Sequence, residues 1–529
     1  MSATATAQEL VVKLHAFGVR EAVLSPGSRS GPLALALAAA DQQGMIRLHV
    51  RVDERESSFL ALGLAKASRR PVPVFTTSGT AVANLHPAML EALHAGVQLL
   101  AVTADRPSRL RDTGANQTTD QRTIFPGVRF IDTPDDLVML MARDQPGHLN
   151  LELDEPLVQP PDAPLEVAGP VTYESGSPRP TQTIAPGLRT VVVAGDDARQ
   201  PARILARDAG WPLLAEPSSG SRNGEALISY RLLLQHSPLA EQIERVVSFG
   251  HATLSRPVTK LLARTDIDIF HVGTQATFPV PAGPNVTFVE MLAVASVVGG
   301  SVVEGSTSWL DSWHAADALA TATVDDVLDG TTPFDVARAV NAAVPPEGLL
   351  FIGSSSPIRD LDLVARPYTV GERRLVISNR GLAGIDGVLS SAIGAALART
   401  SSRAIAYVGD LTFLHGSNGL LIGPAEPRPD LTIVVASDDG GSIFSTLEQG
   451  GPEYASTFER VYATPTGADI GSLCAGYGVS HRIVQPVDLA ASLEEEVAGI
   501  RVLEVPLDRS LRRDLTARIS ASVRFALRP

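Results

Sequence analysis

Short apolar runs alternate with helical patterns along most of the chain. In the first part, the strand-like runs are residues 21–24, 46–50, 72–76 and 97–103. Alanine- and leucine-rich stretches such as residues 32–40 and 59–67 separate them and have helical composition. Buried strands that alternate with helices are typical of a parallel sheet covered on both faces. The pattern therefore predicts an α/β fold made of doubly wound parallel sheets.

The alternation restarts twice. Eight prolines fall between residues 156 and 186, a composition typical of a semi-rigid connection. We therefore predict an α/β domain over residues 1–160, a linker over 161–188, a central α/β domain over 189–332 and a third α/β domain over 333–529. The tail, residues 511–527, has the pattern of a basic amphipathic helix.

Two acidic turns follow neighbouring strand patterns in the third domain. Residues 403–408 lead to Asp410, and residues 431–436 lead to Asp438 and Asp439, with a helix expected over 412–422. If the two strands are parallel neighbours, both turns lie at the carboxyl edge of the sheet, where open α/β sheets bind ligands. Carboxylates and carbonyl groups near glycines suit a hard cation such as Mg²⁺, which usually also holds phosphates. Either Asp438 or Asp439 can supply the second carboxylate, and an ordinary βαβ unit with polar turns is the alternative.

Composition narrows the function classes. The net charge of −14 argues against nucleic acid or an anionic membrane as a partner, so an anionic small substrate would need a local basic pocket. The one cysteine, Cys474, excludes an intramolecular disulfide and a thiolate metal cluster. We find neither a signal peptide nor an apolar run long enough to span a membrane, and we expect a cytoplasmic protein.

Polar side chains follow the strands of the first domain, where such folds keep their chemistry. They are Arg29, Glu54, Ser78, Arg106, Asn116 and Gln117. The central domain lacks a G-x-G-x-x-G turn after its first strand, which argues against a dinucleotide there. It does carry Arg256 after a strand and loop, although alone this residue has the pattern of a surface arginine.

Several motifs occur in an order that resembles the thiamine-diphosphate enzymes of the decarboxylase superfamily. They lie at residues 25–30, 53–55, 77–85, 103–107, 114–117, 148–152, 378–381, 384–387 and 409–411. More narrowly, Ser-Arg-Ser at 28–30, Gly-Ala-Asn-Gln at 114–117 and Ser-Asn-Arg-Gly at 378–381 together resemble the 2-succinyl-5-enolpyruvyl-6-hydroxy-3-cyclohexene-1-carboxylate synthases of menaquinone biosynthesis. The first and third domains carry the resemblance, and the central domain matches weakly.

The resemblance implies a cofactor site. Glu54 would hydrogen-bond the aminopyrimidine of thiamine diphosphate, and Ile385 would keep the cofactor bent. Asp410, the side chain of Asp438 and the carbonyl of Gly440 would bind Mg²⁺, with Mn²⁺ also possible. The implied cofactor contacts are Glu54, Ser355, Ile385, Leu411 and Ile443. The resemblance also implies a homo-oligomer, a dimer or a tetramer, with each active site between subunits.

The implied reaction is decarboxylation of 2-oxoglutarate and 1,4-addition of the succinyl-semialdehyde carbanion to isochorismate. Both substrates are dicarboxylates, which arginine binds through paired hydrogen bonds. The implied substrate residues are Ser28, Arg29, Arg106, Asn116, Gln117, Arg256, Ser355, Arg359 and Arg380. Among these, Arg29, Arg106, Gln117, Arg359 and Arg380 join Glu54 as the implied catalytic residues.

Two alternatives remain open. The first is another thiamine-diphosphate decarboxylase or ligase resembling acetohydroxyacid synthase, whose monocarboxylate donors need fewer arginines. The second is a non-catalytic ligand-binding relative. This alternative is motivated by a difference between this sequence and the family's usual one at the metal site. The family usually has Asn where this chain has Asp438, and often Asn where it has Ser437.

Overall fold

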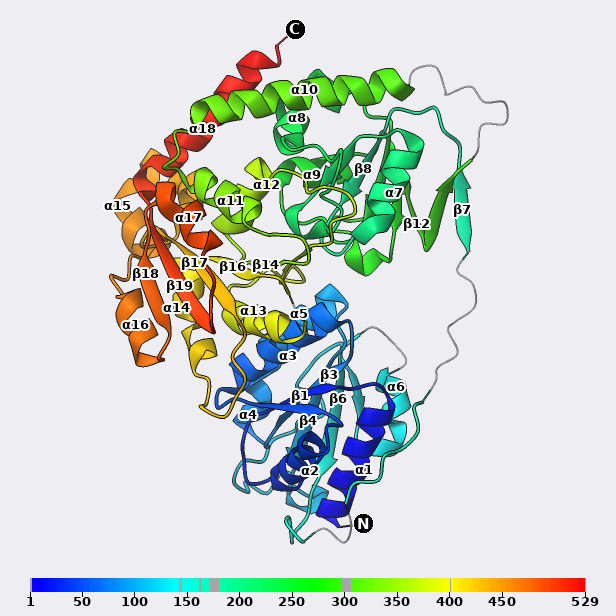
Figure 1. Ribbon diagram of the computed structural model, residues 1–529. Coiled ribbons are helices and arrows are strands. Elements are labelled where there is room, and N and C mark those ends of the chain that lie inside the picture. The colour runs from blue at the N-terminus through cyan, green and yellow to red at the C-terminus, as the bar shows by residue number, and fades with distance from the viewer. Residues whose placement is uncertain are drawn as a thin grey trace.

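A computed structural model describes residues 2–141, 145–160, 164–171, 180–295, 306–399 and 401–528. Within this part the strands form three large sheets in which all pairings are parallel. The predicted fold of doubly wound parallel sheets is confirmed. Figure 1 shows the first sheet at one end of the molecule and the other two at the opposite end.

The first sheet has the strand order β2-β1-β3-β4-β6-β5. Its strands are β1 (Glu21–Leu24), β2 (Arg47–Val50), β3 (Val72–Thr76), β4 (Leu99–Asp105), β5 (Arg129–Ile131) and β6 (Gly147–Glu152). Its helices are α1 (Ala3–Ala16), α2 (Gly31–Gln42), α3 (Glu54–Ser68), α4 (Thr80–Asn84), α5 (His86–Ala95) and α6 (Leu137–Met141). The sequence predicts one helix from residue 80 to 94, whereas the chain breaks it at Leu85, two residues before Pro87.

The central sheet has the order β12-β11-β10-β8-β9, and β13 pairs separately with β7. The strands are β7 (Thr181–Ile184), β8 (Thr190–Ala194), β9 (Leu213–Ala215), β10 (Arg245–Phe249), β11 (Asp268–Val272), β12 (Val286–Val289) and β13 (Met291–Val294). The helices are α7 (Arg199–Ala209), α8 (Tyr230–His236), α9 (Arg256–Leu262) and α10 (Ser306–Val327). Strand β7 lies inside the predicted linker, of which residues 161–163 and 172–179 are outside the described part. The domain boundaries remain predictions.

The third sheet has the order β15-β14-β16-β17-β19-β18. Its strands are β14 (Leu349–Ile352), β15 (Leu375–Ser378), β16 (Ala404–Gly409), β17 (Leu431–Ser437), β18 (Ser480–Ile483) and β19 (Ile500–Pro506). The helices are α11 (Pro333–Ala342), α12 (Ser356–Val364), α13 (Val388–Leu397), α14 (Asp410–His415), α15 (Ala455–Phe458), α16 (Ile470–Gly476), α17 (Leu489–Glu494) and α18 (Arg512–Ala526). Strands β16 and β17 are parallel neighbours with Gly409 opposite Ala436, as the acidic-turn hypothesis requires. The helix between them is shorter than predicted, because α14 ends before Gly416.

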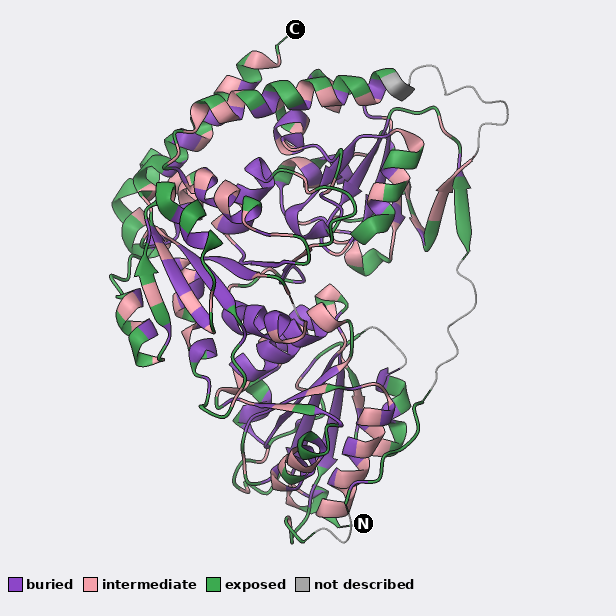
Figure 2. Cartoon of the chain, viewed as in Figure 1, coloured by how far each residue is buried: buried purple, intermediate pink, exposed green. Residues whose placement is uncertain are grey.

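Helices α3 and α13 join the first and third sheets. A Cβ atom on Gly63 would lie 2.0 Å from the Ser391 carbonyl oxygen, and one on Gly394 would lie 2.2 Å from that of Leu60. The two backbones therefore touch, and Figure 2 shows both helices buried at this junction. Apolar residues of both sheets belong to one continuous hydrophobic cluster around this crossing. The first and third domains consequently share a core within one chain.

No helix in the described ranges is long and apolar enough to cross a membrane.

Substitution Gly394→Ala should separate α3 from α13 and lower the free energy of unfolding by about 1–3 kcal/mol, because the added methyl group meets backbone that has no flexible side chain to move. Thermal or denaturant unfolding measures the change. Gly476→Ala is the matched control, since Gly476 ends α16 and no heavy atom lies within 4 Å of its added Cβ. Equal stability of the two variants would contradict the proposed close crossing.

Candidate active site

The acidic turns meet at the carboxyl edge of the third sheet. Asp410 is the first residue of α14 and is 5% exposed. One of its oxygens, Oδ2, accepts a hydrogen bond from the Gly440 N–H at 3.0 Å, and Oδ1 accepts from the Leu411 N–H at 2.6 Å. Burial raises the pKa of Asp410, whereas these backbone donors lower it.

The two candidates for the second carboxylate have different surroundings. Burial, together with the nearby Asp410 carboxylate, raises the pKa of Asp438 to about 7, although a hydrogen bond with the Ser442 side chain opposes the shift. Asp439 is exposed, has a φ of 51°, and accepts hydrogen bonds from the N–H groups of Thr466 at 3.0 Å and Gly467 at 3.1 Å. Asp438 is therefore half-buried near Asp410, and Asp439 caps a separate loop.

A serine-rich turn lies at the same edge, between β14 and α12. The Ser354 hydroxyl is buried without a hydrogen-bond partner among the described residues, and Ser355 has a φ of 71°. Ser356, the first residue of α12, has its hydroxyl 3.4 Å from that of Ser442, which follows the Asp438 turn. An orphan hydroxyl beside a helix N-terminus suits a phosphate group. The edge thus offers carboxylates for a cation and neutral donors for an anion.

In the described part of the chain, no three His, Cys, Asp or Glu side chains converge on one point. A cation held by Asp410 and Asp438 would need further oxygen ligands from the main chain and from a bound molecule. This donor set fits Mg²⁺ with a diphosphate, because Mg²⁺ commonly combines one or two carboxylates with phosphate oxygens.

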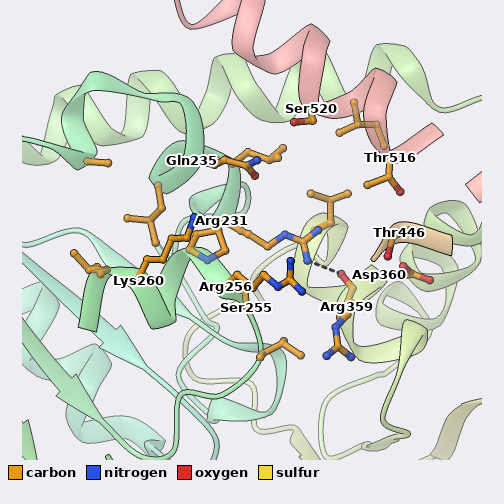
Figure 3. A pocket seen from close by; sticks show the side chains of 18 of the residues that line it. Arg231, Gln235, Ser255, Arg256, Lys260, Arg359, Asp360, Thr446, Thr516 and Ser520 are labelled. Carbon is orange, nitrogen blue, oxygen red and sulfur yellow. Dashed lines mark hydrogen bonds between the residues drawn. The ribbon is translucent and has the colours of Figure 1, made fainter. Parts of the chain in front are cut away.

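A cavity of about 960 Å³ lies between the central and third domains. Figure 3 shows Arg231, Arg256 and Arg359 around it, with Lys260 at one side. Its other lining residues include Ile443. Burial, together with the positive charges of Arg380 and Arg231, lowers the pKa of Arg359 to about 10.

The arginines of this region differ in their partners. Arg359 donates to the Ser355 carbonyl at 2.8 Å, and Arg380, only 3% exposed, donates to the Thr253 hydroxyl at 3.1 Å. The Arg380 Nε is buried without a partner, and neither arginine forms an ion pair with any described residue. In contrast, Arg256 forms a solvent-exposed ion pair with Glu448 at 2.8 Å, as a surface arginine would.

The predicted substrate residues of the first domain gather at the edge of its own sheet. Arg29 is buried and donates to the Leu153 carbonyl at 3.0 Å, and Arg106 donates to the Asn116 carbonyl at 2.7 Å. Gln117 has a φ of 53°, and a Cβ on Gly79 would lie 3.3 Å from its Cα. Ser28, which precedes Arg29 in the chain, is exposed, and so are the side chains of Asn116 and Gln117. The larger cavity is lined only by residues from Arg231 to Ser520, so it does not include this group.

Sequence reasoning missed a fully buried glutamine behind these loops. The Gln121 Oε1 accepts from the Gly79 N–H at 2.9 Å, while its Nε2 donates to the Ala104 carbonyl at 3.2 Å and to Asn150 Oδ1 at 2.7 Å. One side chain therefore ties together three segments of the sheet edge. No local pattern distinguishes such a glutamine from its exposed neighbour Gln117, because its partners come from distant strands.

Glu54 begins α3, where the Asp53 carboxylate accepts the N–H groups of Arg55 and Glu56 as an N-cap. The Glu54 Oε2 accepts from Asn84 Nδ2 at 3.1 Å. Ala83, next to that asparagine, lines a second cavity of about 500 Å³.

The opposite wall of the second cavity comes from the third domain. It includes Gly384 and Asp386, the residues on either side of Ile385. Sequence neighbours of Asn84 and of Ile385 therefore line one cavity, whereas Glu54 and Ile385 are not among its lining residues. Leu411 lies at the acidic edge directly after Asp410.

Comparison with known proteins agrees with this arrangement. Residues 4–124 match the family described as "Thiamine pyrophosphate enzyme, N-terminal TPP binding domain", and residues 362–505 match its C-terminal TPP binding domain. A protein from Nocardioides sp. named 2-succinyl-5-enolpyruvyl-6-hydroxy-3-cyclohexene-1-carboxylate synthase is 50% identical over 98% of this chain and 98% of its own length. This chain belongs to that synthase family. Synthases of the same name from Kineococcus radiotolerans and Saccharopolyspora erythraea are 46% and 42% identical, each over 99% of both chains.

Substitution Asp438→Asn should stabilise the cofactor-free synthase more at pH 8 than at pH 5. Because the pKa of Asp438 is raised from 3.8 to about 7, the native protein retains a proton that the unfolded chain has lost over this range. The contribution of Asp438 to the free energy of unfolding of the wild type therefore falls as the pH rises from about 4 to 7. An amide at this position does not titrate, so the variant does not lose this stability. We expect the stability difference to grow by about 1–2 kcal/mol between pH 5 and 8, after allowance for partial solvent screening.

Denaturant unfolding at both pH values measures this difference. Asp439→Asn is the matched control, because its side chain caps Thr466 and Gly467, and it should gain no stability at pH 8. A pH-independent difference for Asp438→Asn would contradict the account of the acidic edge.

Proposed function

We propose that this chain decarboxylates 2-oxoglutarate with thiamine diphosphate and adds the resulting four-carbon unit to isochorismate in menaquinone biosynthesis. Its membership of the synthase family supports this activity. The proposed place of action is the cytoplasm.

The observation that carries the proposal is the pair of neighbouring cations Arg359 and Arg380, neither of which forms an ion pair with a described residue. Arg380 is buried and Arg359 is half-buried, and burial and the charge of Arg380 lower the pKa of Arg359, although the Asp360 and Asp362 carboxylates oppose this shift. Burying like charges together is unfavourable unless a ligand neutralises them. In a chain with a net charge of −14, such a pair fits dianionic substrates. It disfavours the alternative resembling acetohydroxyacid synthase, whose donors carry one carboxylate.

The residues of the acidic edge fit the cofactor. Asp410, Asp438 and the Gly440 carbonyl would hold Mg²⁺, or Mn²⁺ in its place, and Ser355 in the serine turn would lie beside the diphosphate. Bound thiamine diphosphate supplies an electron sink that lets a 2-oxo acid lose carbon dioxide and act as a nucleophile.

The remaining proposed roles belong to side chains of this chain. Glu54 holds a proton at the aminopyrimidine ring, and its bond to Asn84 fixes the carboxylate for that contact. Ile385, Leu411 and Ile443 supply apolar surface that excludes water from the cofactor. Arg359 and Arg380 orient substrate carboxylates, assisted by the polar loops of the first domain. Those loop residues are Ser28, Arg29, Arg106, Asn116 and Gln117, and Arg256 would join them only after leaving Glu448.

We also propose a homo-oligomer with each site shared between subunits. Next to Glu54, Val52 is 67% exposed and Leu421 is 46% exposed. The Asp53 carboxylate accepts from Asn418 at 3.0 Å, which places the two apolar side chains on neighbouring segments. Exposed apolar groups beside a catalytic glutamate are typical of a subunit contact.

An assay of substrate dependence tests the activity. The protein with thiamine diphosphate and Mg²⁺ should release carbon dioxide from 2-oxoglutarate, and isochorismate absorbance should fall only when 2-oxoglutarate is present. Pyruvate should replace 2-oxoglutarate poorly, because it lacks the second carboxylate. Carbon dioxide release from pyruvate alone would overturn the proposal, and cofactor binding without turnover would favour the non-catalytic alternative.

A complementation experiment tests the shared site. Glu54→Gln and Asp410→Asn should each abolish turnover while the chains remain folded. Co-expression of the two variants in equal amounts should restore about one quarter of wild-type activity in a dimer, since half of the dimers are mixed and each has one intact site of two. No recovery would show that Glu54 and Asp410 of the same chain form the site.

A further inference from the structure

The loop that presents Arg380 is held by side chains of the first domain. It runs from Ser378, at the end of β15, to Leu382. Glu91 on α5 is 3% exposed, and its carboxylate accepts the Gly381 N–H through Oε1 at 2.7 Å and the Leu382 N–H through Oε2 at 2.7 Å. Hydrogen bonds from backbone N–H groups to a buried carboxylate are among the stronger ones in proteins.

The other end of the loop is held by a buried ammonium group. Lys66 on α3 is 8% exposed and donates from Nζ to the Ser378 carbonyl. The same Nζ lies 3.9 Å from the Asp196 carboxylate of the central domain. The Lys66 ammonium group therefore fixes the backbone carbonyl at the start of the loop, and the Glu91 carboxylate fixes the backbone N–H groups at its end.

The loop has no room to adjust by sliding along α5. A Cβ on Gly381 would lie 2.4 Å from the Glu91 carbonyl oxygen and 2.9 Å from the Ala95 nitrogen. Between the two anchored ends, Arg380 extends to Thr253 of the central domain. Its direction is consequently fixed by contacts to the first and central domains as well as by its own sheet.

We propose that Glu91 and Lys66 are positioning residues for Arg380, so that recognition of a substrate carboxylate by the third domain depends on the first domain of the same chain. The inference rests on the proposed function, because it assigns the carboxylate-binding role to Arg380. Neither side chain touches substrate. Each acts by setting where the Arg380 guanidinium lies.

Binding of a dicarboxylate that cannot react tests the inference. The probes are glutarate and pentanoate, which differ in one carboxylate, titrated calorimetrically against the enzyme loaded with thiamine diphosphate and Mg²⁺. We expect wild type to favour glutarate, and Glu91→Ala to reduce the ratio of the two affinities about tenfold. Glu91→Gln should have a smaller effect, because its single carbonyl oxygen serves one of the two N–H groups. Lys66→Met should act in the same direction as Glu91→Ala.

Arg69→Ala is the matched control. Arg69 directly follows α3, the helix that carries Lys66, and forms an ion pair with Asp197 of the central domain. Within the described residues it has no hydrogen bond or ion pair to the 378–382 loop. It should leave the affinity ratio unchanged even if it lowers thermal stability.

A double-mutant cycle separates positioning from general packing. If Glu91 acts through Arg380, Glu91→Gln should have little further effect on glutarate affinity in an Arg380→Gln background. Additive effects, or equal losses for glutarate and pentanoate, would overturn the inference. The isosteric Glu91→Gln carries the test if Glu91→Ala fails to fold. A wild-type enzyme that leaves 2-oxoglutarate intact would instead overturn the proposed function, which keeps the two failures distinct.

Discussion

The close crossing of α3 and α13 is the constraint on which the site depends. Gly63 and Gly394 let the two backbones touch, and the Ser391 hydroxyl donates to the Phe59 carbonyl at 3.0 Å across the contact. Glu54 begins one of these helices, and the loop containing Ile385 precedes the other. The crossing therefore fixes the spacing of two half-sites within one subunit, more than 300 positions apart, and under the proposed sharing each half-site is completed by a partner subunit. Larger residues at either glycine would move both walls of the smaller cavity.

Charge supplies the second constraint. The acidic edge of the third sheet raises the pKa of Asp410 and Asp438, and the arginine cavity lowers that of Arg359. Both groups cost free energy in the empty protein, because each concentrates like charges in a partly buried place. A cation with diphosphate would neutralise the first, and a dicarboxylate the second. Functional sites commonly lower the stability of the folded protein in this way, and ligand binding then restores that stability.

The sequence was sufficient to predict the three α/β sheets and the meeting of the two acidic turns at one sheet edge, because the positions of strand ends follow from the local hydrophobic pattern. It left open the choice between Asp438 and Asp439. That choice depends on Thr466 and Gly467, which approach from a separate loop. Glu91, Lys66 and Gln121 were missed for the same reason, since each is a polar residue whose partners lie on other elements. Arg256 had the residue type expected of a substrate ligand, but the structure pairs it with Glu448 at the surface.

A crystal structure with thiamine diphosphate and Mg²⁺ is the most direct test of the central claim, that the acidic edge of the third sheet is the metal–diphosphate site. The account predicts one cation bound by the Asp410 and Asp438 carboxylates and the Gly440 carbonyl, with the diphosphate beside the serine turn and Asp439 still capping Thr466 and Gly467. A cation bound by Asp439 instead of Asp438, or a diphosphate located away from this edge, would contradict it.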